Sequence, residues 1–167
     1  FVVDANIGEV YVAEPGFEQV LRHLRTRVTS VVPEGRRRAI HFLGRFRDVG
    51  AIPALIASLR AKEPDVSGEA AQSLHAITLQ SFGGNDRKWT AWWEKNKSRS
   101  RIEWLIDALK DGDVEVRARA GAELSSLTRD TFGFKADAAR KDRDVAIKRW
   151  ETWWADERRR LMPPGQG

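Results

Sequence analysis

Apolar residues recur along this chain at the spacing of an amphipathic helix. One run places apolar side chains at positions i, i+3, i+4 and i+7, on one face of an α-helix: Ile52, Leu55, Ile56 and Leu59. A second stripe of the same kind runs through residues 66–77. Applied to the whole chain, the pattern predicts helices over residues 17–29, 35–47, 51–61, 65–80, 86–97, 101–110, 114–129 and 144–160.

Residues with known preferences for helix ends support several of these boundaries. Pro64 suits the first turn of a helix, where its missing N–H is not needed. Asp113 can cap the helix that follows it. Ser100 with Glu103 forms the pattern of a capping box, in which each side chain bonds the backbone of the other. We therefore expect helices to begin close to these positions.

Self-comparison shows that the helical pattern is repeated. A shift of 50 residues places the apolar positions of 52–77 on apolar positions of 102–127 without a slip in register. The same shift pairs three further residues, Thr78, Phe82 and Gly83, with Thr128, Phe132 and Gly133. The stretch is long enough that a chance match is a poor explanation.

A tryptophan-bearing segment follows each of these two copies. Trp89, Trp92 and Trp93 correspond to Trp150, Trp153 and Trp154 at a shift of 61. The second copy therefore carries 11 additional residues between Gly133 and Trp150. The pattern does not predict the conformation of residues 134–149.

A third, degenerate copy lies upstream and lacks the tryptophan segment. A shift of 31 places Ala39, Leu43 and Phe46 on the apolar positions Ala70, Leu74 and Ile77. The repeats then span about 17–50, 51–97 and 101–160, within one repeat domain over 17–160. Residues 1–16 are expected to form an extended segment or connector, and 161–167 a flexible tail. One helical hairpin cannot bury its apolar stripe alone, so stacked hairpins are expected.

The expected fold is all-α, a short α-solenoid of about three hairpins, two of them followed by a tryptophan-bearing helix. The sequences of 38–59 and 113–124 resemble the HEAT-repeat consensus. The segment from Thr78 through Phe82 and Gly83 to Trp93 resembles a variant seen in bacterial HEAT-repeat proteins. The resemblance implies a scaffold or adaptor that binds other proteins, as part of a larger bacterial assembly.

The tryptophan triplets have two interpretations, a binding platform or a structural cover for each hairpin. Because the triplet recurs in register after the same Phe-Gly turn, we favour the structural role. The markers of this role are Phe82, Gly83, Trp89, Trp92, Trp93, Phe132, Gly133, Trp150, Trp153 and Trp154. Trp104 has no counterpart in the other copy. It either packs against a triplet or is exposed for a partner, and it is retained as a candidate partner-binding residue.

Arginine is concentrated in the first repeat, where residues 17–50 hold eight Arg against three acidic residues. Four basic residues of the helix predicted there recur at helical spacing and form the candidate partner-binding side: Arg37, Arg38, His41 and Arg45. In the later repeats, His41 corresponds to Gln72 and Ala122 and Arg45 to Ala76 and Ser126, so these two basic residues do not recur, although the leucines do. We therefore favour a role outside the fold, with an ordinary solvated face as the alternative.

Composition narrows the functional classes. The chain has 167 residues, a net charge of +5 and no cysteine, which excludes disulfides and thiolate chemistry. Its three histidines are scattered, so neither a metal nor a cofactor is expected. There is no apolar run long enough to span a membrane. The chain does not begin with Met, which suggests a piece of a longer protein and leaves cytoplasm and periplasm open.

These observations predict a protein-interaction module rather than an enzyme. The alternative is nucleic-acid binding through the arginine-rich face, which would weaken steeply as salt rises. Some HEAT-like proteins excise damaged DNA bases or attach bilin pigments. The tryptophans here are tied to the repeat pattern rather than to a basic groove, so neither activity is expected.

Overall fold

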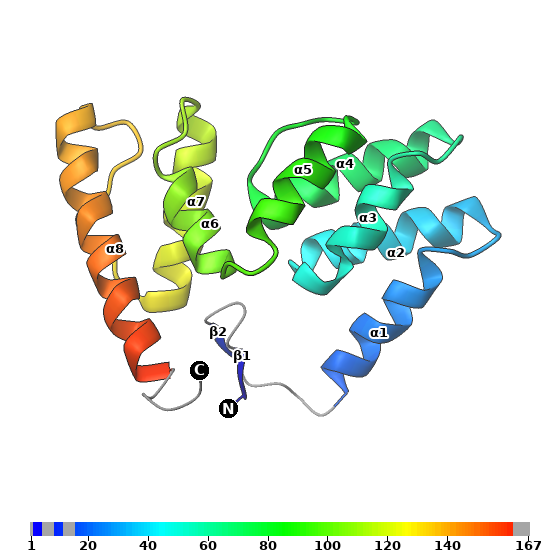
Figure 1. The fold of residues 1–167 in the computed structure, drawn as a ribbon, viewed down its shortest axis with the longest axis horizontal. Coiled ribbons are helices and arrows are strands. Elements are labelled where there is room, and N and C mark those ends of the chain that lie inside the picture. The colour runs from blue at the N-terminus through cyan, green and yellow to red at the C-terminus, as the bar shows by residue number, and fades with distance from the viewer. Residues whose placement is uncertain (1, 5–8, 12–15, 162–167) are drawn as a thin grey trace. The chain divides into compact units, whose positions relative to one another are not determined.

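The computed structural model describes residues 2–4, 9–11 and 16–161, and its core is all-α, as the sequence predicts (Figure 1). The helices of the described residues are α1 (Phe17–Arg27), α2 (Pro33–Arg45), α3 (Ile52–Ser58), α4 (Pro64–Thr78), α5 (Asp86–Asn96), α6 (Arg101–Ala108), α7 (Val114–Thr128) and α8 (Arg140–Leu161). A 3-10 turn, Val49–Ala51, leads into α3.

The helix ends follow the signals in the sequence. Pro64 is the first residue of α4. The capping box of Ser100 and Glu103 is formed at α6, and the Asp113 side chain accepts a hydrogen bond from the backbone N–H of Glu115. The one large difference is α8, which begins at Arg140 rather than at 144, because the inserted residues extend this helix toward its N-terminus.

The two ends of the chain lie only partly within the described residues. Strands β1 (Val2–Asp4) and β2 (Glu9–Tyr11) pair in a two-stranded sheet, and both lie within the segment 1–16. The rest of that segment before Gly16, and the predicted tail from residue 162 onward, lie outside the described residues.

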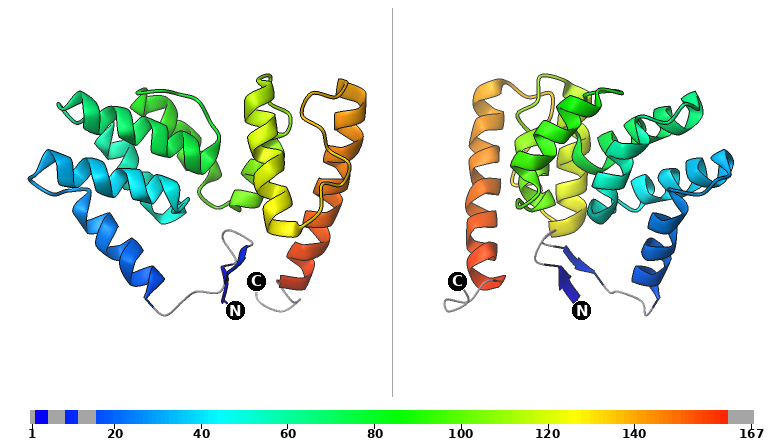
Figure 2. Two further views of the ribbon diagram at one scale, coloured as in Figure 1. Left: turned by 180° about the vertical axis from the view of Figure 1, so that it is seen from behind. Right: turned by 45° about the vertical axis from the view of Figure 1, so that its right-hand side comes forward.

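The helices fall into two compact units, α1–α5 and α6–α8, with the boundary between Ser98 and Arg99. This boundary coincides with the junction predicted between the second and third repeats. In the first unit, α1 packs on α2 and α3 on α4, and the two hairpins meet where α2 lies against α4 (Figures 1 and 2). The tryptophan-bearing helix α5 packs on α3.

The second unit repeats this plan with one hairpin. Helix α6 packs on α7, and the tryptophan-bearing helix α8 packs on α6. The inserted segment lies close to the hairpin, because Phe134 is so near Gly121 of α7 that a Cβ atom there would come within 3.0 Å of the Phe134 ring. The helices of each unit therefore pack against one another.

The backbone repeats two left-handed positions at the 50-residue interval. The residue that follows each of helices α4 and α7 is left-handed: Leu79 (φ 57°) and Arg129 (φ 60°). The next turn is left-handed at Gly83 and again at Gly133. A positive φ is rare outside glycine, so its recurrence at these matched positions shows that the two turns begin alike. They are not identical, because Phe132 is left-handed (φ 47°) and its counterpart Phe82 is not.

Two positions depart from the predicted equivalence. Ile77 is completely buried, but its predicted counterparts Phe46 and Leu127 are 42% and 40% exposed. Phe46 is therefore not buried as Ile77 is, because α2 ends at Arg45 and the Phe46 ring packs edge-on against Phe17. Leu127 lies on α7, which packs extensively on α6. Ile77 lies on α4, which packs extensively on both α2 and α3 and therefore covers more of its surface.

Candidate functional site

The exposed side of α2 carries basic and aromatic residues in one row. Arg38, His41, Phe42, Arg45 and Phe46 follow the spacing i, i+3, i+4, i+7 and i+8, and all five are exposed. The opposite side of the helix is buried in the core. This row, called the α2 face below, contains three of the four basic residues that the sequence nominates, together with two phenylalanines that it does not.

The aromatic rings of the α2 face form a continuous cluster. The Phe42 and Phe46 rings are stacked with centroids 6.1 Å apart, and Phe46 meets Phe17 of α1 edge-on at 5.4 Å. His41 meets Phe42 edge-on at 5.5 Å. Phe42 and Phe46 remain 43% and 42% exposed, and Val20, one turn after Phe17, is exposed as well. Large apolar side chains grouped at a surface mark interaction sites.

The basic residues are partly neutralised by two glutamates. Within α2, Glu34 pairs with Arg37 at 3.0 Å and with Arg38 at 2.9 Å. From α4, Glu69 lies 2.9 Å from His41 Nδ1 and 3.6 Å from Arg37. Arg45 forms no ion pair within the described part of the chain. The sequence could not reveal the contribution of Glu69, which lies 28 residues from His41.

These pairs affect the titration of the exposed groups at the start of α2. Hydrogen bonds from Arg37 and then Arg38 hold the pKa of Glu34 below its ordinary value. The same bond to Glu34 raises the pKa of Arg37. Since Arg37 also reaches toward Glu69, it belongs to the contact between α2 and α4 rather than to the exposed row.

Trp104 is not part of an exposed surface. Its side chain is only 1% exposed, so it is buried rather than exposed for a partner. The side chain lies on α6 among the buried residues of that helix. Of the two interpretations that the sequence allows, the burial fits packing inside the protein.

The tryptophan segments have the same geometry in both copies. Phe82 meets Trp89 edge-on at 4.9 Å, and Phe132 meets Trp150 edge-on at 4.7 Å. Trp89 and Trp150 are completely buried. The remaining tryptophans of the triplets are buried or half-buried: Trp92, Trp93, Trp153 and Trp154. This burial favours the structural interpretation of the markers.

One hydrogen bond distinguishes the two copies. The Trp89 indole donates to the Gly83 carbonyl at 2.8 Å, whereas the buried Trp150 indole N–H has no acceptor among the described residues. The insertion lies between Gly133 and Trp150. The inserted residues separate the Phe132-Gly133 turn from α8. The edge-on contact between Phe132 and Trp150 is present, but the indole hydrogen bond to the turn is not.

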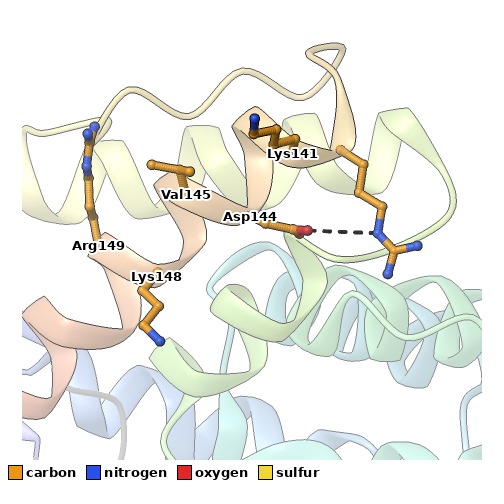
Figure 3. A pocket seen from close by; sticks show the side chains of 6 residues that line it. Lys141, Asp144, Val145, Lys148 and Arg149 are labelled. Atoms are coloured by element: carbon orange, nitrogen blue, oxygen red, sulfur yellow. Dashed lines mark ion pairs between the residues drawn. The ribbon is translucent and has the colours of Figure 1, made fainter.

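A second basic surface lies on α8, and none of its residues is among the candidates that the sequence nominates (Figure 3). Lys141, Val145, Lys148 and Arg149 follow the helical spacing i, i+4, i+7 and i+8, and all are exposed. Arg140 and Asp144 form a loose ion pair of 3.9 Å at its edge. The spacing was readable in the sequence, but it begins inside residues 134–149, for which no helix was expected before 144.

Two further questions for the described residues are whether they could bind a metal ion and whether they could cross a membrane. No group of three His, Asp or Glu side chains in that part of the chain could hold a metal ion. None of the helices described is both long and apolar enough to cross a membrane. Neither the family models nor the curated proteins include a match to this chain.

Proposed function

We propose that this chain is a HEAT-like interaction module, part of a larger bacterial assembly, that binds a protein partner through the α2 face. The observation that carries the proposal is the exposed stack of Phe42 and Phe46 within a row of cations. Aromatic residues and arginine are the residue types that contribute most to protein interfaces. Burying the two half-exposed phenylalanine rings in an interface would also remove apolar surface from water, which favours binding.

The chemistry of the face specifies the partner surface. The two rings and Val20 require apolar side chains opposite them. Arg38 and Arg45 flank the rings and favour carboxylates at the rim of the partner, where charges steer association and select the partner. We therefore expect a partner surface with an apolar centre and acidic edges.

Nucleic-acid binding through the same face is the alternative, and the ion pairs weigh against it. Affinity for phosphates grows with the number of cations available to neutralise them. Here Glu34 and Glu69 already engage Arg37, Arg38 and His41. Arg45 is left as the one cation of this set without an ion pair to a described residue, which is a weak basis for following a phosphate backbone.

The test is capture of a protein partner by the immobilised full chain, with variants of the α2 face compared side by side. The double variant Phe42→Ala, Phe46→Ala removes the rings, and Arg38→Glu, Arg45→Glu reverses the exposed charge. Arg37 is left unchanged because a carboxylate there would face Glu69 of α4. Because the altered side chains lie outside the buried core, each variant should remain folded, and thermal unfolding verifies this.

Matched controls are available outside the α2 face. Leu127→Ala removes an apolar side chain of nearly equal exposure, and Arg119→Glu reverses an exposed charge on α7. A partner captured by the parent and by both controls, but lost with both α2 variants, supports the proposal. Capture that survives the Phe42, Phe46 double variant contradicts it. Recovery of nucleic acid in place of protein, released by salt, would instead establish the alternative.

A further inference from the structure

A pocket of about 360 Å³ opens in the second unit, where the turn between α6 and α7 faces the first turns of α8. Leu109 and Ile147 line it with apolar side chains, and both are buried. The lining is otherwise dominated by cations from three elements: Lys110, Arg117, Arg140 and Arg143. A small concave site with an apolar floor and converging polar groups has the general form of a ligand pocket.

Arg117 is fixed in place without being neutralised. Its Nη1 donates to the carbonyl oxygens of Asp111 at 2.8 Å and Gly112 at 2.9 Å. Its Nε donates to the carbonyl oxygen of Ala136 at 2.9 Å. These three acceptors are neutral, so the side chain is held rigidly while its full positive charge remains. Its Nη2 donates to no described residue.

Arg143 is the second uncompensated cation. Its Nε is buried and has no hydrogen-bond partner among the described residues, and within that part of the chain the side chain forms no ion pair. Burying a guanidinium N–H without an acceptor is unfavourable. The two arginines therefore bring charge that no carboxylate of the described residues balances to the lining of one pocket.

The remaining charged groups of the pocket are largely engaged. Lys110 pairs with Glu151 at 2.7 Å, and Arg140 is 3.9 Å from Asp144. The carboxylate of Asp111 accepts the backbone N–H of Asp113 at 2.8 Å. Counted together, the lining holds four cations and two carboxylates, so it favours an anion.

The insertion supplies much of this pocket. Helix α5 begins three residues before Trp89, but α8 begins ten residues before the equivalent Trp150. Arg140, Arg143 and Asp144 lie on this extension. The first tryptophan-bearing helix packs on its hairpin without any such extension, so packing alone does not require these residues.

We infer that this pocket binds the phosphate group of a small phosphorylated molecule. Guanidinium groups pair with phosphate through parallel N–H···O bonds in a fixed planar geometry. Arg143 of α8 and Arg117 of α7 supply guanidinium groups, and Lys110 and Arg140 complete the positive field. The apolar floor of Leu109 and Ile147 suits the non-phosphate part of the ligand. This inference does not depend on the α2 face.

Inorganic phosphate is the probe, titrated into the full chain at constant ionic strength with chloride as the compensating ion. Nitrogen-resolved NMR follows the Nε–H signals of arginine and the backbone amides. We expect saturable shifts at Arg143 Nε–H and at the amides of 110–117. Arg143→Gln should lower the affinity about tenfold or more, because hydrogen bonds to charged groups are the strong class.

Lys148→Gln is the matched control, since it removes one charge from the same helix but lies on the exposed basic surface outside the pocket. It should leave phosphate affinity within about twofold of the parent, as expected for a screened surface charge. Arg117→Gln provides a second variant, and the amide spectrum of each variant verifies that the second unit is folded.

Three results would overturn the inference. One is the absence of saturable shifts below about 10 mM phosphate, where binding would be weaker than any specific site requires. Another is equal loss of affinity in Arg143→Gln and Lys148→Gln, which indicates a diffuse basic surface. The last is tight binding of a DNA duplex that both variants weaken equally, which would assign the surface to a nucleic-acid backbone instead.

Discussion

Gly44 of α2 lies directly against Ser73 of α4, and a Cβ atom at Gly44 would come within 2.9 Å of the Ser73 Cα atom. The Ser73 hydroxyl also donates a hydrogen bond of 2.9 Å to the carbonyl oxygen of Ile40. The two helices of the first unit thus approach at a point where neither can accommodate a larger side chain. This contact positions the α2 face relative to Glu69.

Gly44→Ala should therefore destabilise the protein by about 1–3 kcal/mol, because the added methyl group meets backbone as well as a side chain. Gly68→Ala is the matched control, since no atom lies within 4 Å of the added Cβ in α4. That change should instead stabilise by roughly 0.5–1 kcal/mol. Urea unfolding followed by tryptophan fluorescence measures both. Equal effects of the two substitutions would show that the helices do not approach as described.

Leu74→Ala and Leu124→Ala should each cost about 2–5 kcal/mol, as large-to-small changes in a core do. Both leucines are completely buried and occupy equivalent positions of the repeat. Ile77→Ala should cost a similar amount, whereas Leu127→Ala, at 40% exposure, should cost well under half of it. Each variant is compared by chemical denaturation. A silent Leu124→Ala would mean that the repeat alignment fails in the second unit.

Arg25 forms two hydrogen bonds with the buried carboxylate of Asp48, at 2.6 and 2.7 Å. Arg25→Met should destabilise by about 1–3 kcal/mol, because it leaves that carboxylate without its charged partner. Arg22→Met, at an exposed ion pair with Glu18, should change stability by no more than about 0.5 kcal/mol. Thermal unfolding of the two variants measures both changes in stability. A larger loss of stability for Arg22→Met than for Arg25→Met would contradict the importance given to the Arg25–Asp48 pair.

Glu34 provides a pH-dependent prediction at the start of α2. Since Arg37 and Arg38 lower its pKa in the folded state, the pair stabilises the protein above the unfolded pKa, and this contribution is lost as pH falls through the folded pKa. NMR titration of the Glu34 carboxyl should show a pKa that rises toward the ordinary value in Arg37→Gln. Arg45→Gln is the control and should leave it unchanged. An equal rise in both variants would contradict the assigned ion pairs.

Much of the fold could be predicted because it depends on local pattern. The apolar spacing located every helix of the described core within a few residues, and the caps at Ser100 and Asp113 were readable from single residues. The recurrence of the Phe-Gly turn and its tryptophans was equally visible. These features are set by neighbouring residues in the chain, so the sequence contains all the information that they require.

The candidate sites depend on residues that are distant in sequence, and here only the tertiary structure decides. Phe46 and Ile77 occupy matching positions, but one is exposed and the other buried, because the end of α2 and the packing around α4 differ. Glu69 neutralises part of a surface 28 residues away. The sequence by itself determined which segments are helical and which repeat. The burial of a side chain and the partner of a charge depend on which helices meet, and that is set by packing across the whole unit.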